Sequence, residues 1–323
     1  MLQHARWAAS LAILALCGCG EQPRTAQAPE QGGGDGPAQY VIGFSQCAGD
    51  EPWREQMDRD IRAAAAAHPE IRLIYKDAQS DSTTQQAHVR EYVTQDVDVI
   101  IISPLDVSLT SAVADAYRAG VPVIVLDRKV EGDQYTCFIG ADNRVIGAAV
   151  GAWVIAHLGG QGRVVELRGL SSSTPAIERS EPFHEAIAGT GIEIVYDADM
   201  EWKGDIAREK MQAALAVNAA GGSIDLVYGA NDPAAIQAWY AAKDAGREAE
   251  IIFVGVDALP HEGVKAVRDG ILDATFQYPN GAAEAIDTAL RILEGAEAPK
   301  TITLGTRLFT PENVDAGGEA IGP

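Results

Sequence analysis

The chain has 323 residues, of which 47% are hydrophobic and 22% charged, a composition typical of globular and not of disordered proteins. Its length exceeds that of a usual single domain, so we expect two domains. Acidic residues outnumber basic ones by 46 to 25. The resulting net charge of −21 argues against a nucleic-acid partner, because phosphate binding requires clustered Lys and Arg.

The first residues have the pattern of an export signal. Arg6 precedes an apolar run from Ala8 to Leu16, which is too short to span a bilayer as a stable helix. The run ends in Leu16-Cys17-Gly18-Cys19, which resembles a bacterial lipobox with Cys19 as the acylated residue. We therefore predict a signal peptide over residues 1–18 and lipidation of Cys19; ordinary secretion with incidental cysteines is the alternative.

Residues 19–39 are mostly Pro, Gly, Gln and Ala, which predicts a flexible tether between the anchor and the folded body. Such an anchored protein would work beside a membrane, outside the cytoplasm. Two cysteines remain in the body. Cys47 follows one predicted strand and Cys137 precedes another, so they should lie at opposite ends of a parallel sheet. We expect buried unpaired thiols there and no disulfide.

From Tyr40 onward, short β-branched runs alternate with Ala-rich amphipathic stretches. This order predicts βαβ units, and hence an α/β fold with parallel sheets. The predicted helices include residues 60–68, 145–158, 205–217 and 281–295. The predicted strands are residues 40–45, 71–76, 98–103, 121–127, 137–142, 163–169, 192–197, 224–229, 251–257 and 271–277.

Polar side chains recur at the carboxyl ends of these strands, where open parallel sheets bind ligands. The run Val123–Leu126 reads as a strand buried on both faces, and Asp127 and Arg128 follow it directly. Asp232, which precedes Pro233, is expected to be a helix cap. The other strand-end residues are Ser45, Ser103, Asn231, Asp257 and Gln277.

An adjacent Asp and Arg suit a small polar molecule such as a sugar. A carboxylate can accept hydrogen bonds from two neighbouring hydroxyls, and a guanidinium donates to two oxygens in a fixed fork. The apolar faces of a sugar ring pack against flat aromatic side chains. Trp53 and Trp202, which we expect on loops, are candidates for that role.

At these residues the sequence resembles the periplasmic sugar-binding proteins of ABC transporters, of the ribose and galactose type. The similarity covers about residues 40–315. The segment "VIVLDR" matches the family's Asp-Arg sugar-binding motif, "IERSEPF" implies a sugar contact for Arg179, and "YGANDPAAIQA" implies one for Asn231. The segment from Phe253 to Pro279 matches one that carries a binding Asp and Gln, here Asp257 and Gln277. Ser103 stands where relatives often have Asn.

The segment "VIGFSQCAGDEPWREQM" is most similar to the galactofuranose-binding subgroup, which implies that Trp53 and Arg54 line the pocket. Trp202 stands where relatives place an aromatic residue against the sugar. The sequence departs from the family at Pro182, where Gly is usual, and in the loop that carries Asp50 and Glu51. These departures bear on which sugar is bound.

The resemblance implies a type I periplasmic binding protein fold, with two doubly wound parallel-sheet lobes joined by three chain crossings. The N-terminal lobe would comprise residues 40–143 and 278–305, and the C-terminal lobe residues 144–277 and 306–323. Binding would close the hinge around the ligand. As a clamp residue, Asp127 should be needed for binding but not for folding.

The expected function is capture of a monosaccharide, a pentose or hexose with the furanose form as one alternative, by a monomer that delivers it to an ABC transporter permease. The alternative is a sensor that presents its ligand to a membrane histidine kinase or chemoreceptor. An enzyme is not expected, because no G-x-S-x-G elbow and no metal-ligand spacing occurs. We expect no cofactor and no metal.

Overall fold

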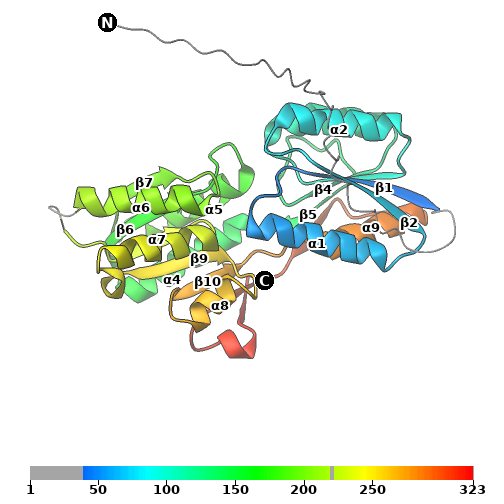
Figure 1. Cartoon of the computed structure of the whole chain (residues 1–323). Helices are drawn as coiled ribbons and strands as arrows, with labels where there is room; N and C mark the ends of the chain where they lie inside the picture. Colours follow the sequence, from blue (N-terminus) through cyan, green and yellow to red (C-terminus); the bar gives the residue numbers. More distant parts are fainter. Residues whose placement is uncertain (1–38, 219–221, 323) are drawn as a thin grey trace, which may run out of the picture. The chain divides into compact units, whose positions relative to one another are not determined.

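The computed structural model describes residues 39–218 and 222–322. Strands and helices alternate along this part of the chain, in two sheets (Figure 1). The first sheet has the strand order β11-β5-β4-β3-β1-β2, and all its pairs are parallel. Its strands are β1 (Tyr40–Gln46), β2 (Ile71–Asp77), β3 (Val99–Ile102), β4 (Val123–Leu126), β5 (Cys137–Ala141) and β11 (Thr301–Leu304).

Helices cover both faces of the first sheet, because successive strand residues point to opposite faces and both sets are apolar. Ile101 and Ile124 face α1 (Pro52–Ala66) and α9 (Ala282–Leu293). The neighbouring Ile100 and Val123 face α2 (Ser82–Thr94) and α3 (Thr110–Arg118). In Figure 1, α2 and α1 lie on opposite sides of these strands.

The second sheet has the order β13-β12-β10-β9-β8-β6-β7. It is parallel except at β12 and β13, which pair antiparallel. Its strands are β6 (Gln161–Arg168), β7 (Gly191–Asp199), β8 (Leu226–Gly229), β9 (Ile252–Asp257), β10 (Ala274–Gln277), β12 (Thr306–Phe309) and β13 (Glu319–Ile321).

The second sheet is also covered on both faces. Helices α4 (Asn143–Leu158) and α5 (Thr174–Ile187) pack on one face, where Phe183 contacts Tyr228. Helices α6 (Gly204–Asn218), α7 (Asp232–Asp244) and α8 (Gly263–Arg268) pack on the other. The chain passes between the sheets three times: after β5, after β10, and between β11 and β12.

The predicted α/β class and the predicted parallel strands are confirmed, and each of the ten predicted strands overlaps an observed one. The sequence reading missed β11, β12 and β13. Cys47 and Cys137 are buried and unbridged. The predicted signal peptide, the lipidated Cys19 and most of the tether lie outside the described residues.

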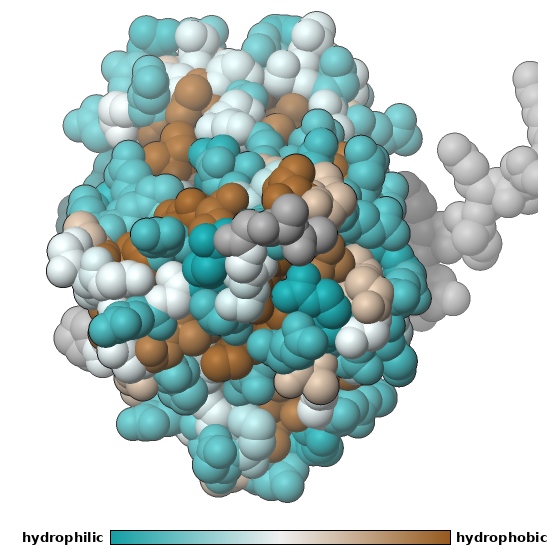
Figure 2. Space-filling model, turned by 90° about the vertical axis from the view of Figure 1, so that its left-hand side faces the viewer, coloured by the Kyte–Doolittle hydropathy of each residue, from teal (hydrophilic) through white to brown (hydrophobic). Residues whose placement is uncertain are grey.

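The described surface shows no broad apolar area on the face drawn in Figure 2, where hydrophobic residues are broken up by hydrophilic ones. Large exposed hydrophobic side chains occur singly, at Val107, Tyr117, Ile177, Val217 and Tyr240. Among the described residues, no helix has the length and hydropathy needed to cross a membrane.

Candidate functional site

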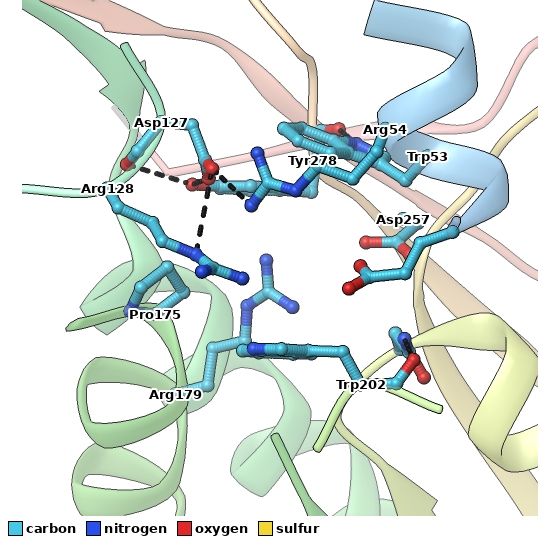
Figure 3. Close-up of a pocket in the computed structure, with 11 residues that line it drawn as sticks. Trp53, Arg54, Asp127, Arg128, Pro175, Arg179, Trp202, Asp257 and Tyr278 are labelled. Carbon is cyan, nitrogen blue, oxygen red and sulfur yellow. Dashed lines mark hydrogen bonds and ion pairs between the residues drawn. The ribbon is translucent and has the colours of Figure 1, made fainter. Parts of the chain in front are cut away.

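A central pocket of about 290 Å³ lies at the carboxyl ends of strands from both sheets, the edge where α/β sheets bind ligands. Figure 3 shows side chains from the two sheets converging on it. The lining residues are Glu51, Trp53, Arg54, Asp127, Arg128, Pro175, Arg179, Trp202, Asn231, Asp257 and Tyr278.

Asp127 follows β4 directly and is held by a dense set of donors. Its Oδ2 lies 2.6 Å from Nη2 of Arg54 and accepts a hydrogen bond from the Ser103 hydroxyl at 3.1 Å. Its Oδ1 accepts from the Tyr278 hydroxyl at 2.7 Å. These donors fill three of the about four acceptor positions of a carboxylate. Asp127 therefore orients Arg54 and Tyr278 and has room for one further hydroxyl, not two as the sequence suggested.

The guanidinium groups keep unused donors. Arg54 Nη1 donates to the Ser103 hydroxyl at 2.8 Å, and Arg128 Nη1 donates to the Leu105 carbonyl at 2.7 Å. The Nε–H groups of both arginines and the indole N–H of Trp202 are buried without a hydrogen-bond partner in the described chain. Leaving a buried donor unpaired costs stability, so these groups are candidates for ligand oxygens.

Aromatic rings form two sides of the pocket. Trp53 stacks on Tyr278 with the ring centroids 5.2 Å apart, and its indole N–H donates to the Tyr278 carbonyl at 2.7 Å. Trp53 lies in the first turn of α1, so the expectation of a loop position was wrong for this residue. Trp202 does lie on a turn, between β7 and α6, with the Arg179 guanidinium 5.5 Å from its ring centroid.

Three pocket residues adopt left-handed backbone conformations that favour glycine. The φ angles are +70° at Asp127, +66° at Trp202 and +125° at Asp257. Such angles are uncommon for residues with a Cβ and are found at sites where the surrounding structure enforces them. Here Asp127 directly follows β4, Asp257 is the last residue of β9, and Trp202 lies in the turn after β7.

Asn231, and not Asp232, caps helix α7. The Asn231 side chain accepts a hydrogen bond from Ala234 N at 3.0 Å. It also donates to the Trp202 carbonyl at 3.1 Å and so helps to hold the backbone of Trp202 in place. Asp232 is the first helical residue, and its buried carboxylate accepts from Ala258 N and the Thr275 hydroxyl. The sequence-based assignment of Asp232 as the cap was therefore wrong.

Three of the predicted ligand residues do not line the pocket. Ser103 lies behind it and positions Arg54 and Asp127. The Ser45 hydroxyl faces α2 and lies 3.2 Å from His88 Nδ1. Gln277 lines a neighbouring groove between α1 and α9. The other eight predicted residues, Trp53, Arg54, Asp127, Arg128, Arg179, Trp202, Asn231 and Asp257, are brought together at the pocket.

Sequence reasoning missed three lining residues. Tyr278 follows Gln277 directly. Because successive residues of a strand point to opposite faces, this alternation predicts that Tyr278 points away from the side that Gln277 faces. Pro175 lies in the first turn of α5, after a serine-rich loop. Glu51 immediately precedes α1; it was noted as a departure from the family but was not assigned to the site.

The two sides of the pocket differ in electrostatics. Burial raises the pKa of the Asp127 carboxyl, but Arg54, Arg128 and the hydrogen bonds to Asp127 outweigh burial, and the net pKa is lowered. Burial raises the pKa of Asp257 well above its usual value, against the opposing effect of Arg179. Burial likewise raises the pKa of Glu51. Asp127 is therefore ionised at neutral pH, whereas Asp257 holds its proton more tightly.

Stability should fall as pH rises, in part because of Glu262, next to α8. Burial, with a smaller contribution from Glu55, raises the pKa of Glu262 to about 7. An unfolded glutamate titrates near ~4.3, so between these values the folded state holds the extra proton and each rise in pH favours unfolding. We expect Tm to fall from pH 5 to pH 8, and Glu262→Gln to reduce that slope.

The matched control is Glu284→Gln, which changes an exposed glutamate on α9. Thermal unfolding of all three proteins across the pH range measures the effect. Equal slopes in the wild type and Glu262→Gln would show that Glu262 is not protonated preferentially in the folded state. Asp232 and Asp257, with pKa values raised by burial, should leave part of the slope in place.

No group of three or more His, Cys, Asp or Glu side chains within residues 39–218 and 222–322 is arranged to hold a metal ion. The donors and aromatic faces of the pocket suit a small organic molecule and not a metal ion.

Comparison with known proteins identifies the family. Residues 42–297 match the periplasmic binding protein domain. The galactofuranose-binding protein YtfQ of Escherichia coli (strain K12) is 30% identical over 285 residues, which are 85% of this chain and 89% of the relative. The ribose import binding protein RbsB of Bacillus subtilis (strain 168) is 28% identical over 93% of this chain and 96% of its own length.

A solved structure, the fructose binding periplasmic domain of a hybrid two component system, superposes with a TM-score of 0.82. It is 39% identical, and the match covers 86% of this chain and 93% of that one. The two parallel-dominated sheets agree with the type I fold implied by the sequence. These relatives are binding proteins and not enzymes. The chain therefore belongs to the periplasmic binding protein family.

Proposed function

We propose that this protein is an extracytoplasmic lipoprotein that captures one monosaccharide in the central pocket and delivers it to an ABC transporter permease. The observation that carries the proposal is the composition of the pocket: guanidinium and indole donors without a partner in the described chain, the Asp257 carboxyl, and flat rings on two sides. Hydroxyl groups and apolar C–H faces, which alternate around a sugar, match these partners.

The relatives bear on the class of sugar. The similarity to a ribose import binding protein and a galactofuranose-binding protein favours a pentose or hexose, in the pyranose or the furanose form.

The placement of the lining residues supports hinge closure. Asp127 follows a strand of the first sheet, and Asp257 one of the second, so a bound sugar would bridge two lobes. We assign residues 40–143 and 278–305 to one lobe, and 144–277 and 306–323 to the other. The ligand would select the closed form, and the permease would recognise that form.

Membrane attachment is supported by the sequence of the amino-terminal segment, with Cys19 as the lipidated residue. We propose that the protein acts as a monomer on its tether. Mass spectrometry of the protein from its native membrane tests the lipid: a diacylglyceryl thioether on Cys19 supports the anchor, and an unmodified protein beginning elsewhere contradicts it.

The test of sugar binding is a thermal-shift screen of the purified protein against pentoses, hexoses and furanose-locked sugars. Ligand at about 100 times its Kd should add about 2.7 kcal/mol to the free energy of unfolding and raise Tm by several degrees. A clear shift with one sugar supports the proposal. No shift with any sugar, for folded protein free of co-purified ligand, contradicts it.

A sensor function is the second candidate, favoured by the similarity to the periplasmic domain of a hybrid two component system. Deletion of the protein distinguishes the two functions. Loss of uptake of the bound sugar indicates transport. Normal uptake with loss of sugar-dependent gene expression indicates sensing.

A further inference from the structure

Two chain segments that carry pocket arginines are joined to each other beside the pocket. Arg128 and Lys129 follow β4 of the first sheet, whereas Glu178 and Arg179 lie on α5, which packs on the second sheet. Both arginines line the pocket, and Lys129 and Glu178 are not among its lining residues. A contact between Lys129 and Glu178 therefore links the two lobes without the ligand. The inference drawn from it rests on the proposed function, in which a sugar is held between these lobes.

Lys129 makes two polar contacts with α5. Its Nζ donates to Oε1 of Glu178 at 2.6 Å, and the two side chains form an ion pair. Its backbone N–H donates to the Thr174 hydroxyl at 3.1 Å. Thr174 is the first residue of α5, and Pro175, which follows it, lines the pocket. One residue beside the first sheet thus contacts two successive turns of a helix on the second.

The ion pair is partly removed from water. The Glu178 side chain is 19% exposed and that of Lys129 is 43% exposed. The second carboxylate oxygen of Glu178, Oε2, is buried without a hydrogen-bond partner in the described chain. Pairs between fully exposed side chains contribute little. Here, loss of the ammonium group would leave a largely buried carboxylate without its counter-ion, which is costly.

The same pair bears on the geometry of the pocket. The guanidinium groups of Arg128 and Arg179 lie 5.9 Å and 5.5 Å from the centroid of one ring, that of Trp202. Each arginine is the chain neighbour of one member of the ion pair. The distance between Lys129 and Glu178 therefore limits how far apart the two guanidinium groups can lie.

We propose that Lys129 and Glu178 are positioning residues, which hold the two lobes closed around the sugar without contacting it. The pair forms only when the lobes meet, so it stabilises the closed form and not the first encounter of the sugar with an open cleft. Loss of the pair should accelerate release more than it slows association. Because the pair makes no contact with the sugar, it should favour closure by the same factor with and without ligand.

The test is stopped-flow tryptophan fluorescence, which measures kon and koff. The probe is the sugar with the largest thermal shift, and D-ribose, D-galactose, L-arabinose and D-fructose are the first four screened. Lys129→Met keeps an unbranched side chain and removes the charge. It should raise koff about three- to tenfold and leave kon within about twofold of the wild type. The Tm of the ligand-free protein should stay unchanged, because the pair joins two lobes and supports the core of neither.

Reversal of the pair separates its electrostatic role from side-chain packing. Lys129→Glu places two carboxylates together and should raise koff by more than Lys129→Met does. Lys129→Glu combined with Glu178→Lys restores an attraction between the lobes, and koff should return to within about threefold of the wild type. A role of either residue in packing alone would not be rescued in this way.

The matched control is Glu181→Gln, on the same helix. Glu181 pairs with Arg144 of α4 at 2.9 Å, and both helices pack on the second sheet, so this ion pair does not join the lobes. Its removal should change neither kon nor koff. An increase of koff as large as that of Lys129→Met would show that the charge of α5, and not the link between the lobes, controls release.

The outcomes separate this inference from the proposed function. If Lys129→Met releases the sugar at the wild-type rate, or if the reversed pair releases it as fast as Lys129→Glu alone, the role of the pair is wrong and sugar binding stands. If the thermal-shift screen finds no sugar ligand, the proposed function fails and the ligand-free protein decides on the pair. Small-angle X-ray scattering then compares the wild type with Lys129→Met: a larger radius of gyration in the variant supports the pair, and equal radii contradict it.

Discussion

Replacing Asp127 with alanine should abolish ligand binding and also lower the free energy of unfolding by about 3–5 kcal/mol. Asp127 is 4% exposed and neutralises Arg54, which is itself 3% exposed. Removing the carboxylate leaves a buried guanidinium without a counter-ion and frees the Tyr278 hydroxyl. The sequence-based expectation that the fold would be unaffected treated Asp127 as a clamp residue only.

Thermal unfolding and calorimetry measure this effect. Asp133→Ala is the control, an exposed aspartate in the same loop, and it should retain both Tm and affinity. Arg54→Met introduced together with Asp127→Ala should recover part of the lost stability, because Arg54 is then no longer buried without a counter-ion, whereas Arg128, 3.9 Å from Asp127, still loses its ion-pair partner. A wild-type Tm for Asp127→Ala would show that Arg54 is adequately solvated without its partner.

Gly147→Ala should destabilise the protein by about 1–3 kcal/mol and weaken ligand binding. A Cβ on Gly147, in α4, would lie 2.2 Å from the Arg179 carbonyl oxygen in α5. Glycine to alanine within a helix ordinarily adds up to about 1 kcal/mol of stability, so the expected sign is reversed by the clash. Separating α4 from α5 also moves Arg179, whose Nε donates to Asn143.

The control for this substitution is Gly305→Ala. Its Cβ would meet no atom within 4 Å, so Tm should stay unchanged. Comparison of Tm for the two variants tests the helix contact directly, and sugar affinity is compared between Gly147→Ala and the wild type. A Gly147→Ala protein more stable than the wild type would mean that the two helices can separate at little cost.

The sequence predicted the central strands β3, β4 and β8 well, because each is a continuous apolar run with both faces covered. Ile100 and Ile101, for example, contact helices on opposite faces of the sheet. The strands β11 and β12 were missed because "TITL" and "TRLF" are short, and only half of their residues are apolar. The partner of β11, β5, is far away in the sequence, and the near partner of β12 is β13, which has only three residues, so local pattern gives little sign of either strand.

The ends of the predicted strands correctly identified the edge of the sheet that carries the site. They did not predict the direction in which each side chain points. Gln277 and Tyr278 are adjacent, yet Tyr278 lines both the pocket and the groove beside it, whereas Gln277 lines only the groove. Ser45 likewise faces α2, while the next residue, Gln46, accepts from Arg54 at 3.3 Å. A shift of one residue changes the face of a strand, and sharp turns after strands obscure the count.

The left-handed backbone at three pocket residues implies a trade-off between stability and function. Glycine would adopt the conformation of Asp257 without strain, and Asp257→Gly would also remove an unpaired buried carboxyl. Selection for thermal resistance alone should therefore replace these three pocket residues with glycine, and the pocket would lose the side chains that bind the ligand. In natural evolution, the need to hold the ligand must oppose that drift.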